Sequence, residues 1–115
     1  VRVLHFNQDE VALSTGMEDL IAEMANVLRD NPELKLTIEG HTDADPKRTP
    51  ESRFDVSLQR ALAVYRQLRL THSVAPRRLA VSAAGDSHQV DAAGTGFSRT
   101  LNRRVEFKFS ETKDK

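Results

Sequence analysis

The apolar residues of this chain follow two different periods in turn, and this alternation restricts the folds that the chain can adopt. Between residues 16 and 30 they recur every three or four positions, which predicts an amphipathic helix that ends at Asn31-Pro32. Residues 34 to 39 then alternate between apolar and polar side chains, as in a strand with one buried face. A helix that leads directly into a half-buried strand indicates a sheet covered by helices.

The remaining segments extend this pattern. They predict a second helix at 50–70 and strands at 1–6, 79–83 and 105–110, with one short helical turn near the end of the connection 85–100. The predicted fold class is therefore α+β: a two-layer sandwich of βαβαββ order, with both helices packed on one face of a mixed four-stranded sheet. Residues 1–110 are expected to form one domain, and residues 111–115 a polar C-terminal tail.

Composition excludes several classes of protein. No segment approaches the roughly eighteen consecutive apolar residues of a membrane span, so we expect no membrane contact by this domain itself. The 17 basic and 17 acidic residues cancel, and the basic pairs Arg77-Arg78 and Arg103-Arg104 lack stacking aromatic neighbours, so we expect no nucleic acid partner. Without cysteine, disulfides and thiolate metal sites are excluded.

A dense polar cluster follows the second predicted strand, which ends in Gly40. His41, Thr42, Asp43 and Asp45 lie within five residues. One interpretation is a polar turn in which Asp43 caps backbone N–H groups. Another is a metal-dependent hydrolase that uses His41, Asp43 and Asp45, but no further histidine stands at a recognisable ligand spacing. A nucleophile for a catalytic pair is also missing, so we predict neither an enzyme nor a metal or cofactor.

Arg60 changes the interpretation of this cluster. Taken alone, it is a solvated arginine on the side of the second helix away from the apolar residues. The chain must fold back between strand and helix, however, so Asp43 and Arg60 can face one pocket. An anion and a cation in one pocket complement a zwitterion, because the guanidinium fork binds a carboxylate and the aspartate accepts from an ammonium.

Four short motifs then suggest a family. In order along the chain they are GHTD at 40–43, VSLQRA at 56–61, GD at 85–86 and RTLNRRV at 99–105. Together they resemble the OmpA-like peptidoglycan-binding domain, which is found in OmpA-type porins, Pal lipoproteins and MotB-type flagellar stator proteins. The resemblance covers nearly the whole chain, and the order and spacing of GHTD and NRRV are its most specific part.

The resemblance implies a function and a set of site residues. The family binds the peptide stem of peptidoglycan, chiefly meso-diaminopimelate, without catalysis, and so anchors a periplasmic domain of a membrane-anchored envelope protein to the cell wall. By resemblance, Asp43 receives the ammonium of diaminopimelate and Arg60 holds its carboxylate. Thr42 helps to orient the ligand, Arg104 lines the pocket edge, and His41 is structural. Alanine at position 43 or 60 is expected to weaken binding and to leave the fold intact.

The sequence departs from the family pattern near this site. Arg53 replaces the asparagine before the LS pair, Val56 replaces its leucine, and Ala83 and Gln89 replace a glycine and a proline. The loop after GHTD is longer and lacks its usual glycine. Arg53 either adds an anion contact or points to solvent. An alternative therefore stays open: an assembly module of a flagellar stator or secretion complex that has weakened or lost wall binding, with a homodimer as one arrangement.

Overall fold

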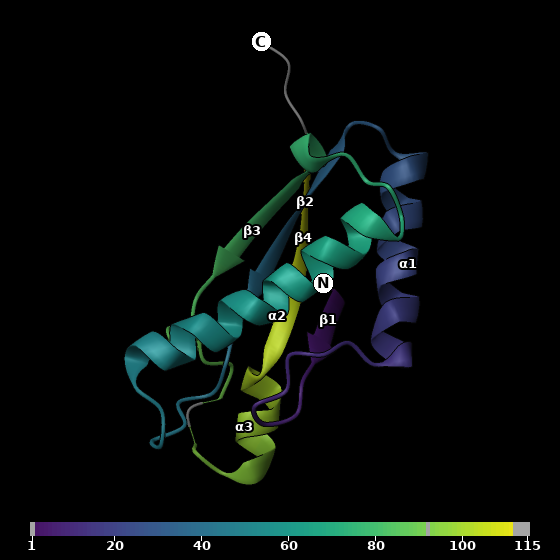
Figure 1. The fold of residues 1–115 in the computed structure, drawn as a ribbon. Coiled ribbons are helices and arrows are strands. Elements are labelled where there is room, and N and C mark those ends of the chain that lie inside the picture. The colour runs from purple at the N-terminus through teal and green to yellow at the C-terminus, as the bar shows by residue number, and fades with distance from the viewer. Residues whose placement is uncertain (1, 92, 112–115) are drawn as a thin grey trace.

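The computed structural model of the protein describes residues 2–91 and 93–111. Within them (Figure 1) the chain forms, in order, β1 (Arg2–His5), α1 (Thr15–Asp30), β2 (Leu34–Gly40), α2 (Pro50–Leu70), the short 3-10 helix η1 (Pro76–Arg78), β3 (Leu79–Ala83), α3 (Gly96–Asn102) and β4 (Arg104–Glu111). The strands make one sheet of order β1-β4-β2-β3. β3 runs parallel to β2, whereas β4 is antiparallel to both β1 and β2, so the predicted mixed sheet is confirmed.

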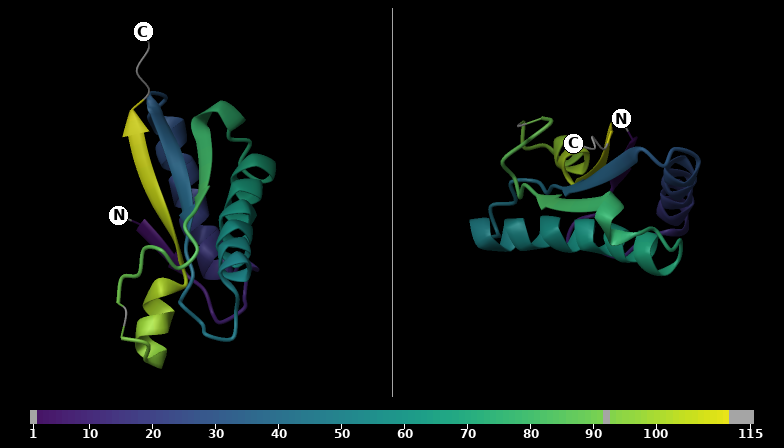
Figure 2. Two further views of the ribbon diagram at one scale, coloured as in Figure 1. Left: turned by 90° about the vertical axis from the view of Figure 1, so that its left-hand side faces the viewer. Right: turned by 90° about the horizontal axis from the view of Figure 1, so that it is seen from above.

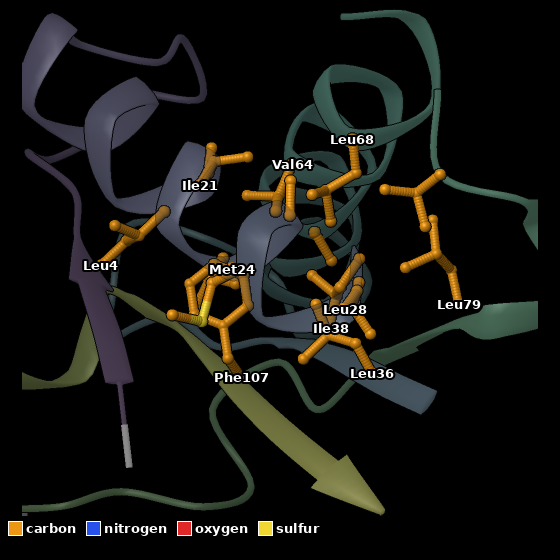
Figure 3. Packing of buried hydrophobic residues seen from close by; sticks show 14 of the residues in the cluster. Leu4, Ile21, Met24, Leu28, Leu36, Ile38, Val64, Leu68, Leu79 and Phe107 are labelled. Atoms are coloured by element: carbon orange, nitrogen blue, oxygen red, sulfur yellow. The ribbon is translucent and has the colours of Figure 1, made fainter. Parts of the chain in front are cut away.

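Helices α1 and α2 cover one face of this sheet, as predicted (Figure 2). Their apolar stripes meet the inward side chains of the strands in a single core. Figure 3 shows its centre, which includes Leu4, Ile21, Met24, Leu28, Leu36, Ile38, Val64, Leu68, Leu79 and Phe107. The alternation of β2 thus points Leu36 and Ile38 into the core. None of the helices among the described residues is both long and apolar enough to cross a membrane.

The structure differs most from the predicted elements at α3 and β4, whereas β1, α1 and β2 each begin or end one residue from a predicted bound. α3 is a helix of seven residues where a single turn was predicted; its GFSRTLN sequence is mostly small and polar, so periodicity does not reveal it. Thr95 begins this helix by accepting a hydrogen bond from the N–H of Ser98. β4 starts one residue early at Arg104 and ends at Glu111, which pairs with Leu34 in the ladder with β2. The rest of the predicted tail, 112–115, lies outside the described residues.

Gly40 allows α2 to cross very close to the end of β2. A Cβ atom built on Gly40 would lie 1.9 Å from the carbonyl oxygen of Ser57 and 3.3 Å from the Cβ atom of Ala61. No real side chain tolerates the first contact, and its partner is helix backbone that cannot rotate away. The glycine of GHTD therefore has a packing role: it lets the helix that carries Arg60 lie against the strand end that carries Asp43.

We expect Gly40→Ala to lower the free energy of unfolding by about 3 kcal/mol or more, since overpacking against fixed backbone forces the helix away from the sheet. Urea denaturation followed by circular dichroism measures this. Gly16→Ala is the matched control, because a Cβ atom at Gly16 meets nothing within 4 Å. It should stabilise α1 by up to about 1 kcal/mol. Equal stability of the two variants would contradict the close crossing.

Candidate functional site

Three connecting segments meet at the C-terminal end of β2. These are the β1–α1 connection (6–14), the β2–α2 loop (41–49) and the β3–α3 connection (84–95). Backbone hydrogen bonds join the last of these to β2 and its loop: the N–H of Thr42 donates to the carbonyl of Gly85, and that of Ala84 to the carbonyl of Gly40. In Figure 1 this end of the sheet is the lower one, where α3 also lies. The predicted site residues are therefore gathered where the sheet stops and loops begin.

Arg60 is completely buried under these loops, so the interpretation of Arg60 as a solvated helix arginine is wrong. Its Nη1 donates to the carbonyl of His41 and to Oγ1 of Thr42, both at 3.3 Å. The guanidinium carbon lies 5.2 Å from the centre of the Phe6 ring, within reach of a cation–π interaction. Burial lowers the pKa of Arg60 to about 10, partly opposed by the negative charge of Asp43, so the group remains charged at neutral pH.

The outer edge of the Arg60 guanidinium binds backbone of the β1–α1 connection. Nε donates to the carbonyl of Glu10 at 2.8 Å, and Nη2 donates to the carbonyl of Asn7 at 3.0 Å. These two N–H groups form the fork with which arginine binds a carboxylate. Two carbonyl oxygens therefore occupy the positions that a carboxylate would take.

Asp43 is brought close to Arg60 but has a different ion-pair partner. Thr42 lies between them: its hydroxyl accepts from Arg60 and is 3.4 Å from Oδ1 of Asp43. Oδ2 of Asp43 pairs with Nη1 of Arg103 at 3.2 Å, and both side chains are largely buried. Arg103 also donates to the carbonyl of Phe6. The sequence analysis missed Arg103, although neighbouring residues at a strand start face opposite sides and only one of Arg103 and Arg104 could reach Asp43.

Arg104 is the residue that faces the other way. Its Nε donates to Glu106 at 2.6 Å and its Nη2 to the carbonyl of His88 at 3.0 Å. Arg53, in contrast, stays near the site. It donates to the carbonyl of Asp45 and forms an ion pair with Asp86 at 3.2 Å, so it neither points freely to solvent nor offers an unpaired charge.

A cleft opens on the surface between the β1–α1 connection and the β2–α2 loop; neither Asp43 nor Arg60 lines it. We call it the loop cleft; it has a volume of about 470 Å³ and carries both signs of charge, and its lining residues are Gln8, Asp9, Asp45, Lys47, Arg48, Thr49 and Ser52. Arg48 and Asp9 form an ion pair across it, which joins the β2–α2 loop to the β1–α1 connection. The pKa of Asp45 lies below its ordinary value, mainly because its carboxylate accepts a hydrogen bond from the N–H of Lys47. A hydrogen bond from the amide of Gln8 lowers this pKa further. Arg104 and Arg53 do not line this cleft.

His41 belongs to a separate network on the sheet face away from α1 and α2. Its Nε2 lies 3.0 Å from Glu39 and 3.8 Å from Glu106. In the described part of the chain, one group of three side chains could hold a metal ion, and it consists of Glu39, His41 and Glu106. Asp43 and Asp45 are not part of this group. The ammonium of Lys108 already lies 2.8 Å from Glu39 and 3.8 Å from Glu106. This arrangement gives the metal-hydrolase alternative no support.

Comparison with known proteins places the chain in a family. The family model of the OmpA family matches residues 5–103, which include every motif named above except the last two residues of NRRV. The chain belongs to the OmpA family.

Solved structures of OmpA-like domains have the same fold. The peptidoglycan-associated lipoprotein from Burkholderia pseudomallei superposes with a TM-score of 0.88 at 24% identity, over 96% of this chain and 91% of that one. The C-terminal domain of Helicobacter pylori MotB superposes with a TM-score of 0.86 at 25% identity, over 98% of this chain and 88% of that one. The cell wall anchor of the T6SS from Pseudomonas aeruginosa superposes with a TM-score of 0.77 at 22% identity, over 96% of this chain and 80% of that one. The predicted resemblance to the OmpA-like domain is thereby confirmed.

Because Arg60 joins the loops, we expect Arg60→Ala to lower the free energy of unfolding by about 2–5 kcal/mol, since it removes the hydrogen bonds that the guanidinium donates to three carbonyl oxygens. This revises the expectation that alanine at position 60 leaves the fold intact. The control is Arg66→Ala, an exposed position on the same helix, which should change stability by less than about 0.5 kcal/mol. Chemical denaturation of both variants measures the two changes in the free energy of unfolding. A change in Arg60→Ala as small as that in Arg66→Ala would refute the structural role of Arg60.

Stability should also fall as the pH drops below 6.5. Burial, helped by the charge of Arg104, holds the pKa of His41 below its ordinary 6.5, against the opposing pull of Glu106 and Glu39. Protonation would also leave an N–H at Nδ1, a buried atom without a partner among the described residues. The unfolded chain therefore takes up a proton between pH 6.5 and the lower folded pKa, and folding is disfavoured there.

This pH effect can be isolated by substitution. His41→Gln should flatten the pH dependence of the unfolding free energy between pH 7 and 5, measured by urea titration at several pH values. His72→Gln controls for the loss of a histidine at the far end of α2. Burial would raise the pKa values of Glu39 and Glu106. Lys108 beside Glu39 and Arg104 beside Glu106 outweigh burial and lower these pKa values, so both carboxylates stay ionised in this range. An unchanged slope in His41→Gln would assign the effect to another group.

Proposed function

We propose that this domain binds the peptide stem of peptidoglycan and so tethers an envelope protein to the cell wall, without catalysing a reaction. The observation that carries the proposal is the mixed charge at the end of β2. Asp43, Arg60 and Arg103 are largely buried where the β1–α1 connection meets the β2–α2 loop, and the loop cleft between these two segments carries Asp9 and Asp45 as well as Lys47 and Arg48. A ligand with both an ammonium and a carboxylate, such as meso-diaminopimelate, complements such an arrangement.

The geometry suggests how the carboxylate would be held. The fork of Arg60 is preformed by its bonds to Thr42 and His41, but its outer edge binds the carbonyls of Asn7 and Glu10. A ligand carboxylate would replace these two carbonyls, which requires the β1–α1 connection to move outward. The Arg48–Asp9 pair that holds this connection is partly exposed, so its rupture costs about 1 kcal/mol or less.

The ammonium of the ligand would be bound by a carboxylate near the Arg60 guanidinium. Asp43 is the leading candidate, with Thr42 fixing its orientation. Arg103 neutralises Asp43 in the free protein, so an arriving ammonium shares or displaces that partner. Arg53 holds the loop through Asp45 and Asp86 in this proposal, and Arg104 supports it from the opposite face.

The relatives agree with this assignment. One structure of similar fold is described as a cell wall anchor, another as a peptidoglycan-associated lipoprotein, and a third as the periplasmic domain of MotB. These descriptions support a periplasmic location, and in this proposal the domain belongs to a membrane-anchored envelope protein. The cleft holds the hydroxyls of Thr49 and Ser52, but their hydrogen-bond partners among the described residues are the N–H of Ser52 and the guanidinium of Arg48 and not a general base, which fits a binding function better than hydrolysis.

Titration calorimetry with a diaminopimelate-containing muropeptide tests the proposal. We expect saturable binding that weakens as salt rises, because both partners are charged and the cleft is partly open. Asp43→Asn should weaken binding by about 2–5 kcal/mol, since it removes one partner of a desolvated charge pair and keeps its shape. The control Asp55→Asn, an exposed acid on α2, should bind like the wild type.

The alternative outcomes are distinct. A folded wild-type domain that does not bind the muropeptide would contradict wall anchoring and favour the assembly module, for which sedimentation equilibrium would then reveal a homodimer. Binding that survives Asp43→Asn would keep the function but move the ammonium site elsewhere.

A further inference from the structure

A second hollow lies on the α3 side of the site. We call it the α3 cavity; its volume is about 90 Å³, and it is lined by Ala44, Gln89, Asp91, Gly94, Ser98, Arg99 and Asn102. Ala44 lines this cavity while its neighbour Asp45 lines the loop cleft, so adjacent residues of one loop border the two hollows. A ligand bound at the loop cleft would therefore lie within a few residues of the α3 cavity.

Most polar side chains around the α3 cavity are already used within the protein. The Asn102 side chain accepts from the N–H of Val90 at 2.6 Å and donates to the carbonyl of Asp91 at 2.7 Å. Ser98 donates to that same carbonyl at 2.9 Å. Gln89, where the family pattern has a proline, donates to the carbonyl of Thr42 at 3.0 Å. These contacts fix the cavity wall and leave few donors for a ligand.

Arg99 is the exception. Its side chain is half-buried on α3, and among the described residues it forms no hydrogen bond or ion pair. It acts on Asp45 only through its charge, which contributes to lowering the pKa of that carboxyl. Three other arginines of this end, Arg48, Arg53 and Arg103, each have a carboxylate partner, and the buried donors of Arg60 are bonded to carbonyl oxygens and the Thr42 hydroxyl. A half-buried guanidinium that keeps all its donors unused beside a cavity is a site for an anion.

We propose that Arg99 binds a second carboxylate of the ligand, distinct from the one assigned to Arg60. This inference rests on the proposed function, because the ligand is taken to be a peptide stem, which carries carboxylates besides that of diaminopimelate. A cavity of about 90 Å³ accommodates a carboxylate, and Arg99 in its lining favours the charged peptide over the neutral hydroxyls of a glycan. Arg99 would then make the site selective for stems whose further carboxylates are free.

The charge balance supports an anion there. Asp91 also lines the cavity, but its Oδ1 accepts from the N–H of Ala93, and its backbone carbonyl accepts from Ser98 and Asn102. Its carboxylate is thus turned toward its own loop. Arg99 is the single basic side chain in the lining. A carboxylate from outside would form a charge-assisted hydrogen bond in a partly enclosed position, where such bonds are stronger than on an open surface.

The test is a two-by-two comparison by titration calorimetry. The wild type and Arg99→Gln are each titrated with two stem peptides that contain diaminopimelate: one with all carboxylates free, the other with every carboxylate outside diaminopimelate amidated. We expect Arg99→Gln to weaken binding of the free peptide about 5- to 20-fold, in keeping with a partly exposed charge-assisted bond. It should leave binding of the amidated peptide unchanged.

Two controls separate this inference from the proposed function. Arg66→Gln removes the same charge from an exposed position on α2 and should behave like the wild type with both peptides. Because the Arg99 side chain forms no hydrogen bond with the described residues, Arg99→Gln should melt at the wild-type temperature. If the wild type binds and Arg99→Gln weakens both peptides equally or neither, the second carboxylate site is refuted. If the wild type binds neither peptide, the proposed function itself fails.

Discussion

The functional end of this domain depends on one buried guanidinium. Arg60 joins the connection before α1 to the loop after β2 through bonds to Asn7, Glu10, His41 and Thr42. A charge buried this deeply is stable only when its donors are satisfied, so the loops must adopt positions that supply acceptors. The same requirement explains the shape of the loop cleft, whose walls are these two segments. An arginine that holds the loops of a site together also prepares the site for an anionic ligand.

The family motifs are understandable as parts of one contact region. Gly40 has no side chain because the backbone of Ser57 passes there. The Ser57 hydroxyl in turn accepts from the N–H of Gly85 at 2.9 Å, and the carbonyl of Gly85 accepts from Thr42. Gly85 itself has φ +56, a conformation that glycine adopts without strain. GHTD, the serine before Arg60 and the GD turn are distant in sequence but form one continuous set of contacts.

Charge is divided between the two sides of the sheet end. Arg103 pairs with Asp43 on the side of the loops, whereas Arg104 joins Glu106, with Glu39, His41 and Lys108 nearby, on the side away from α1 and α2. The division follows from the alternation of a strand, since consecutive side chains leave its plane in opposite directions. The two adjacent arginines therefore support the site in different ways. Arg103 neutralises the carboxylate of Asp43, and Arg104 holds the β3–α3 connection through a hydrogen bond to the carbonyl of His88.

The sequence by itself determined the order of the strands and long helices, the apolar faces that form the core, and the grouping of Thr42 and Asp43 near Arg60. These follow from periodicity and chain connectivity, which are local properties. The tertiary structure decided which cation pairs with Asp43, that Arg60 is buried, and that α3 is a full helix. Ion pairing and burial depend on register and on how loops close over a strand end. Such contacts join residues up to 97 positions apart, as between Phe6 and Arg103, and no local pattern encodes them.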